Sequence, residues 1–310
     1  MSIKNIKLDD RIRYKAYHKS DTDFAAYARL IQSIWREEKG YKIGSYIVKT
    51  KDIELGNYIK KEIAFKDGCN FLTQTIRDVV KQAIEHKESG AKIEKNRLYT
   101  NLLSSQPLAF NLFAELKINR DLATAFFANQ FPEKVETVID ILFEHSEGRG
   151  KIEYTGDHSA FDVFVKFKHR RGGIGFIAIE VKYAENMADT PATHKIRYEE
   201  LSRNSGIFYE NIDALKRKHI QQIWRDHLLS IAHVKESNQK YTEGIFVFLY
   251  PSENEQCQNA VNKYRAQLVS DKEDETGFCP RLLEDYIAAI MDITNDKWIK
   301  DLRERYFREI

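Results

Sequence analysis

The sequence predicts an α/β fold, in which helices cover both faces of a mixed β-sheet. Three observations lead to this prediction. Apolar residues recur with a helical period through most of the first 150 residues, the period falls to two between residues 151 and 185, and an isolated apolar run at 244–251 follows a further helical stretch. Helices, then three strands, a helix, a strand and final helices require a sheet with helices on both sides.

Composition limits the class of protein and its organisation. The chain has 310 residues, of which 42% are hydrophobic and 31% charged, as is usual for globular proteins. It is somewhat longer than the roughly 250 residues at which single cores stop growing. We therefore expect a helical N-terminal region, residues 1–120, packed on a core domain at 121–310. The net charge of +2 means that any nucleic-acid surface must be a local patch.

Cysteine usage and hydropathy predict a cytoplasmic protein. Cys69, Cys257 and Cys279 are widely spaced and fit neither a disulfide framework nor a zinc site. Free thiols are typical of a reducing compartment. The first twenty residues lack the apolar segment of a signal peptide, and no apolar run approaches the ~18 residues that a membrane span needs. We expect no membrane partner.

The N-terminal part is predicted to be helical. Apolar residues share one face of residues 21–40 and again of residues 70–90, and each stretch ends at a glycine. In residues 96–117, Ser105 is a candidate N-cap with Pro107 in the first turn. A further helix is expected at 131–148, with Val135, Val138, Ile139 and Leu142 facing inward.

Two alternating strands follow, joined by a glycine-rich loop at 169–173. Pairing Lys168 with Ile174 keeps the wholly apolar faces of the two strands together and places Asp162 directly opposite Glu180. A one-residue slip would put an acid into the apolar face. Beyond the hairpin, the pattern predicts helical structure at 198–234, a strand at 244–251, an acidic loop at 270–277, and helices at 254–268, 280–293 and 297–307.

The opposed carboxylates indicate a metal site. Directly opposed side chains have Cβ atoms roughly 4.5–5.5 Å apart, so two acids there must share a proton, pair with a cation or bind a metal. Lys182 lies one pleat from Glu180, roughly 7 Å along the same face. Oxygen ligands suit Mg²⁺, which can activate water for phosphoryl displacement. The alternative is a surface ion pair of little energetic value, although the strand around Glu180 is otherwise apolar.

Asp162, seventeen intervening residues and then Glu180-Val181-Lys182 resemble the motif of the PD-(D/E)XK nuclease superfamily, the restriction-endonuclease-like fold. Residues 101–113 are similar to an upstream block of a group of bacterial restriction-type endonucleases. Phe161 follows Ala160 where the family nominally has proline before the aspartate. The resemblance implies an αβββαβ core, Mg²⁺-dependent phosphodiester hydrolysis, Asp162 and Glu180 as metal ligands, and Lys182 as a catalytic residue beside them.

The resemblance also implies further site residues. An upstream acid often completes such sites; Glu136 is the preferred candidate, with Glu133 and Glu144 as alternatives. A polar residue on the following helix often does so too, and Gln222 is the candidate there. Asp157 and His158 precede the catalytic strand and either assist at the metal or, for Asp157, cap a turn. His219, His227 and His233 lack cysteine partners at zinc spacing, and we interpret them as structural.

Basic residues around the second helical stretch are candidates for contacts with DNA phosphates. They are Lys195, Arg197, Lys216, Arg217, Lys218 and Arg225. Nearby acids make a merely solvated face an equal alternative.

The resulting hypothesis is a Mg²⁺-dependent deoxyribonuclease of restriction type, in which Mn²⁺ can substitute. Its partners would be DNA, a second copy in a homodimer that cuts both strands, and an associated DNA methyltransferase. Two alternatives stay open. One is a catalytically silent nucleic-acid-binding or assembly protein on the same fold, and the other is a structure-specific DNA repair nuclease.

Overall fold

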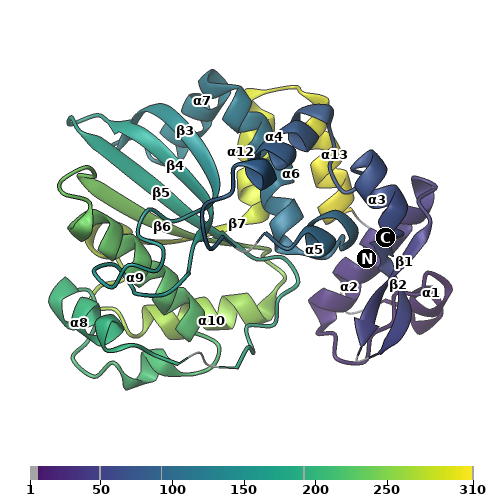
Figure 1. The fold of residues 1–310 in the computed structure, drawn as a ribbon, viewed down its shortest axis with the longest axis horizontal. Helices are drawn as coiled ribbons and strands as arrows, with labels where there is room; N and C mark the ends of the chain where they lie inside the picture. Colours follow the sequence, from purple (N-terminus) through teal and green to yellow (C-terminus); the bar gives the residue numbers. More distant parts are fainter. Residues whose placement is uncertain (1–5, 49, 92, 191–192, 309–310) are drawn as a thin grey trace.

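The computed structural model describes residues 6–48, 50–91, 93–190 and 193–308. Its centre is a five-stranded sheet in the order β3 (Val135–His145), β4 (Phe161–His169), β5 (Ile174–Val181), β6 (Glu243–Tyr250) and β7 (Phe278–Leu282) (Figure 1). β3, β4 and β5 pair antiparallel, whereas β5, β6 and β7 pair parallel. The predicted mixed sheet of an α/β protein is confirmed.

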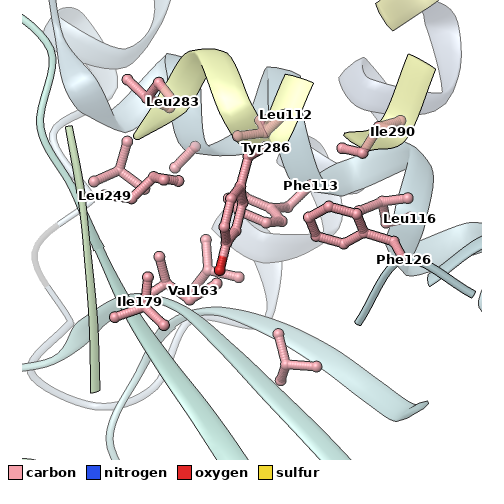
Figure 2. Packing of buried hydrophobic residues seen from close by; sticks show 14 of the residues in the cluster. Leu112, Phe113, Leu116, Phe126, Val163, Ile179, Leu249, Leu283, Tyr286 and Ile290 are labelled. Atoms are coloured by element: carbon pink, nitrogen blue, oxygen red, sulfur yellow. The ribbon is translucent and has the colours of Figure 1, made fainter. Parts of the chain in front are cut away.

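Helices cover both faces of the sheet. On one face, α6 (Ser105–Ile118), α7 (Arg120–Gln130), α12 (Leu283–Ile293) and α13 (Lys297–Phe307) share an apolar cluster with the strands. Figure 2 shows Tyr286 of α12 directed toward Val163 and Ile179 of the sheet, and its ring meets those of Phe113 and Phe126 edge-on. On the other face, α8 (Ile196–Ser205), α9 (Gln221–Glu236) and α10 (Glu255–Arg265) pack over a second cluster.

The predicted hairpin has the predicted register. β4 pairs with β5 from Val163↔Ile179 to Lys168↔Ile174, and residues 170–173 form the loop, since His169 still belongs to β4. Val163, Val165 and Phe167 enter the first cluster, as the alternation requires. Strict alternation would place Phe161 on that face too, but it packs in the second cluster, so the alternation breaks at the start of β4. The succession α7-β3-β4-β5-α9-β6 supplies the αβββαβ order that the family resemblance implies.

The helix predicted at 131–148 is wrong, because residues 135–145 form strand β3. The buried residues Val135, Val138 and Ile141 lie three positions apart, which imitates a helical period. Two register shifts against β4, at Val135/Thr137 and Val138/Asp140, explain this spacing. Each such irregularity inserts a residue into the strand and moves the next apolar side chain by one position.

The N-terminal region contains a β-hairpin that the sequence analysis did not predict. The hairpin is the antiparallel pair β1 (Ile43–Val48) and β2 (Lys51–Ile59). The helices of this region are α1 (Leu8–Arg13), α2 (Asp23–Glu38), α3 (Lys61–Asp67), α4 (Gln74–Glu85) and α5 (Lys95–Thr100). Phe24 and Ala28 of α2 join the first apolar cluster. The side chain of Gln32 also exchanges hydrogen bonds with Arg305 of α13. This region is therefore packed on the core.

The C-terminal part departs from the prediction in smaller ways. Residues 198–234 divide into α8, the short 3-10 helix η2 (Asp213–Lys216) and α9, and the expected acidic loop contains the single turn α11 (Glu273–Thr276). β7 was also not predicted. Within the described parts of the chain, no helix is both long enough and apolar enough to cross a bilayer.

Candidate active site

Asp162 and Glu180 meet at one edge of the sheet. Asp162 is the second residue of β4 and Glu180 the penultimate residue of β5. Val163↔Ile179 is the last pair of the ladder, so Asp162 and Glu180 follow it at the same end of the hairpin, and the charge of Glu180 acts on Asp162. The Asp162 Oδ2 atom accepts a hydrogen bond from the Val181 backbone N–H at 2.9 Å. The structure thus brings together the two acids that the sequence analysis paired.

Lys182 and Gln222 converge on the same carboxylate oxygen. Lys182 Nζ donates to Glu180 Oε1 at 2.6 Å, and Gln222 Nε2 of α9 donates to that atom at 2.8 Å. Glu180 is only 7% exposed and Lys182 5%. Buried charges need partners, and here each charge has one. Gln222 therefore lies where the sequence analysis expected it.

Charges at this edge alter the ionisation of the site. Burial, together with the charges of Glu180 and Glu144, raises the pKa of Asp162 well above its usual range. For Lys182, burial opposes the charged form, but the carboxylates of Glu180, Glu185 and Asp162 outweigh it and raise the pKa of the ammonium. Lys182 is therefore held as a cation. This favours orientation of water or stabilisation of developing negative charge over proton abstraction.

Glu144 is the upstream acid that reaches the site. It is the penultimate residue of β3, with a left-handed backbone (φ 50°) that is uncommon outside glycine. Its Oε1 accepts a hydrogen bond from Gln106 Nε2 of α6 at 2.7 Å. Burial raises the pKa of Glu144 to about 7; the Gln106 hydrogen bond opposes this shift and the charge of Glu180 adds to it.

The preferred upstream candidate, Glu136, does not reach the site. Its carboxylate lies 3.1 Å from Lys168 Nζ, near the hairpin loop at the far end of β4. The eight positions from Glu136 to Glu144 span about 25 Å of extended strand. Glu133, which precedes β3, lies beyond the same far end. The error follows from the helix expected at 131–148, since alternating strand geometry was not applied to these acids.

Asp226 is a site residue that the sequence analysis did not consider. It lies one helical turn after Gln222, and such i, i+4 neighbours share a helix face. Asp226 is 5% exposed, and its buried Oδ2 has no hydrogen-bond partner among the described residues. Burial and the charge of Glu180 raise its pKa well above the usual range. The i, i+4 spacing from Gln222 was the available signal.

Asp157 and Arg225 hold the loop that precedes β4. The Asp157 carboxylate accepts from the Ser159 N–H at 3.0 Å, from Arg225 Nη2 at 3.1 Å and from the Tyr198 hydroxyl. Arg225 also donates to Ser159 Oγ at 2.9 Å. Asp157 therefore acts as a loop cap, the second of its two predicted roles. Arg225 has a structural task in addition to any contact with DNA.

Several predicted phosphate-binding residues already have partners within the protein. Lys195 donates to the Gly156 carbonyl, and Arg197 to the carbonyls of Glu153 and Tyr154. Lys216 pairs with Glu199 at 2.8 Å and with Asp213 at 3.1 Å. These contacts agree with the alternative of a charge-compensated face.

Arg217 and Lys218 are both exposed. They are therefore the members of the predicted set that are best placed for phosphate contacts.

The donor set fits a metal that keeps most of its water. Among the residues that the structure describes, no three His, Cys, Asp or Glu side chains form a group able to hold a metal ion. Mg²⁺, however, usually binds through one or two carboxylates together with water and substrate phosphates. The facing carboxylates of Asp162 and Glu180 meet that requirement.

Comparison with known proteins identifies one family. The family model of the PD-(D/E)XK nuclease superfamily matches residues 19–308, which include the N-terminal hairpin as well as the sheet. No curated protein and no solved structure matches the chain significantly.

Proposed function

This chain belongs to the PD-(D/E)XK nuclease superfamily, and we propose that it is a Mg²⁺-dependent endonuclease that hydrolyses phosphodiester bonds in DNA. The observation that carries the proposal is the convergence of Asp162, Glu180 and Lys182 at one sheet edge, with Lys182 Nζ 2.6 Å from Glu180 Oε1. A catalytically silent protein would have no need to hold a half-buried aspartate beside a buried glutamate–lysine pair.

Each residue has a task in the proposed reaction. Asp162 and Glu180 would hold Mg²⁺, which supplies an activated water and charge stabilisation for in-line displacement. Lys182 holds its proton, orients the attacking water and offsets the charge that develops on the phosphate. Gln222 fixes the Glu180 carboxylate through its 2.8 Å hydrogen bond. Glu144, held by Gln106, adds a third carboxylate to the same edge.

A restriction-type role is the preferred assignment within this activity. It rests on the resemblance of residues 101–113 to an upstream block of restriction-type endonucleases. These residues include the start of α6, from which Gln106 contacts Glu144, so the block contributes directly to the candidate site. Cleavage of both strands would require two such sites, as in a two-fold dimer, and restriction would require a partner DNA methyltransferase. A cytoplasmic location accords with three free cysteines.

A cleavage assay tests the proposal. Purified protein with Mg²⁺ or Mn²⁺ should cut duplex DNA, and EDTA should abolish cutting. The Asp162→Asn, Glu180→Gln double variant is the control for contaminating nucleases. If linear, circular, methylated and single-stranded DNA all survive prolonged incubation at high protein concentration, the protein is a binding module.

A further inference from the structure

A large cleft lies beside the candidate active site, between the β1–β2 hairpin and α5. Its volume is about 800 Å³, and it is lined by residues of β1, the end of β2, the start of α3, and α5. Ligand sites typically have volumes of about 300–1,000 Å³. None of the roles proposed above for the catalytic edge uses this space.

Aromatic side chains form a ladder on the hairpin wall of the cleft. The rings of Tyr46 and Tyr58 both line it and stack on each other, with centroids 5.6 Å apart and planes 15° from parallel. His18 meets Tyr46 edge-on at 6.2 Å. Both tyrosines are partly exposed. Partly exposed, stacked aromatic rings offer a flat apolar face to a planar ligand such as a nucleobase.

The cleft is continuous with the catalytic edge through Arg97. This residue lines the cleft, and its Nη2 lies 3.8 Å from Oε1 of Glu185, three residues after Lys182. Arg97 Nε also donates to Oγ of Ser104 at 2.8 Å, and Ser104 is the N-cap of α6, the helix that carries Gln106. One arginine thus connects the cleft with both sides of the site.

The hairpin is fixed relative to α5. Asn57 Nδ2 donates to Asn101 Oδ1 at 2.8 Å, and the Leu102 N–H donates to the Asn57 carbonyl at 2.9 Å. The two walls of the cleft are therefore tied together.

The charge of the residues that line the cleft indicates whether it holds the bases of a single strand or the phosphate backbone of a duplex. Three lining residues are basic, namely Lys60, Lys61 and Arg97, and four are acidic, namely Asp52, Glu54, Glu62 and Glu94. A groove for the backbone of a duplex needs a clear excess of positive charge. Carboxylates can instead accept hydrogen bonds from the amino groups of bases. This balance of charges therefore favours a single strand whose bases enter the cleft and whose phosphate lies at the Arg97 end.

We propose that this cleft binds an unpaired DNA strand that leads away from the scissile phosphate, with a base stacked on Tyr46 and a phosphate at Arg97. The proposal deepens the proposed nuclease function and rests on it for the position of the scissile phosphate. It makes the preferred substrate a DNA in which duplex adjoins a single-stranded segment, and so favours the structure-specific alternative over the restriction-type role.

The test measures binding separately from cleavage. Fluorescence anisotropy in EDTA with labelled oligodeoxycytidine, whose bases carry amino groups, should show about tenfold weaker binding for Tyr46→Ala, the usual scale for one lost stacking contact. Tyr46→Phe keeps the ring and should bind as the wild type does. Tyr209→Ala, which removes a 55% exposed tyrosine elsewhere, is the matched control. Wild-type protein should prefer a tailed over a blunt duplex, and Tyr46→Ala should lose this preference.

A crosslinking measurement covers the case in which Tyr46→Ala fails to fold. Irradiated iododeoxyuridine oligonucleotide should attach to the wild-type peptide that contains Tyr46. Wild-type affinity in a folded Tyr46→Ala variant, or crosslinks confined to other peptides, would overturn the proposal. Binding that depends on Tyr46 in a protein that cuts no DNA would instead reject the nuclease function and leave the cleft assignment standing.

Discussion

Lys182 Nζ and Glu180 Oε1 lie 2.6 Å apart at the end of β5, and both side chains are at least nine-tenths buried. A surface ion pair, which was the alternative for this motif, is largely solvated and contributes little to stability. A buried pair is different, because the loss of either partner leaves the other charge uncompensated. The pair is therefore an integral part of the buried strand end, and its energetic consequences can be measured.

Replacing Lys182 with Ala should lower single-turnover cleavage by about 10²-fold or more, the scale expected for electrostatic or acid–base groups. Affinity for DNA in Ca²⁺ should change little, since the ammonium acts at the attacking water. Lys168→Ala is the control, because Lys168 forms an exposed ion pair with Glu136 on the same sheet. If the Lys182→Ala variant cuts at the wild-type rate, Lys182 is only the ion-pair partner of Glu180.

Glu144→Gln and Glu136→Gln form a matched pair on one strand. The first removes a carboxylate that interacts with Glu180 and Asp162, and cleavage should fall at least about tenfold, since several kcal/mol of charge stabilisation can depend on such groups. The second breaks an exposed pair with Lys168, so activity should stay at the wild-type level. Single-turnover rates across a range of Mg²⁺ concentrations would measure both effects. Equal rates for the two variants would remove Glu144 from the site.

The hairpin that carries the motif was predictable because local pattern alone determines it. Alternation over β4 and β5, together with the glycines of the loop, fixes the register, and the register brings Asp162 and Glu180 to the same end of the hairpin. Gln222 could be anticipated from the family resemblance. The β4–β5 hairpin needs no information about distant parts of the chain.

Glu144 and Asp226 were missed for different reasons. Glu144 depends on β3, whose register shifts against β4 hide the alternation in the sequence. Asp226 has the right helical spacing, but its significance comes from burial against β5, a tertiary property. The β1–β2 hairpin was overlooked because many of its residues are exposed, which leaves only a weak apolar pattern.

Asp162→Asn should raise the free energy of unfolding in metal-free buffer by about 1 kcal/mol, since it removes one of two like charges facing across the ladder. The amide oxygen of Asn can still accept the Val181 N–H, so the local hydrogen bond survives. Urea denaturation with EDTA, and then with added Mg²⁺, would measure the change. The metal should stabilise the wild type more than the variant. A marked loss of stability without metal would make Asp162 a structural ion-pair partner.

Arg217→Ala combined with Lys218→Ala should weaken DNA binding. The slope of log affinity against log salt concentration should become shallower by the amount expected for roughly two lost phosphate contacts. Single-turnover cleavage at saturating protein should be nearly unaffected. Lys216→Ala is the neighbouring control, because Lys216 is occupied by Glu199 and Asp213. Titrations at several salt concentrations would test this assignment. An unchanged salt slope in the double variant would place the phosphate contacts elsewhere.

His233 gives the protein a built-in sensitivity to acid. Its Nδ1–H donates to the Leu229 carbonyl at 2.8 Å, and its Nε2 accepts the Glu147 N–H at 3.2 Å. Protonation of Nε2 would place its N–H against the backbone N–H of Glu147 and break this hydrogen bond. Burial lowers the pKa of His233 to about 4, against the opposing hydrogen bond to Leu229. His227, which is also buried, has its pKa lowered to about 4 for the same reason.

The contribution of these two histidines to the free energy of unfolding should therefore decrease as the pH falls from about 6.5 to about 4, whereas the raised pKa values of Glu144, Asp162 and Asp226 act in the opposite direction. In that window the unfolded chain, with a histidine pKa of about 6.5, binds protons that the folded protein excludes, so acid favours unfolding. Each buried histidine contributes up to about 3 kcal/mol to this loss, which is complete only below the folded pKa. Denaturation curves of the wild type and of a folded His233→Asn variant at several pH values should give slopes that differ by about one proton in this window, the fall in stability toward acid being weaker in the variant. Replacement of the exposed His219 should leave the slope unchanged. An identical slope in the wild type and in His233→Asn would mean that His233 takes up its proton without opening the fold.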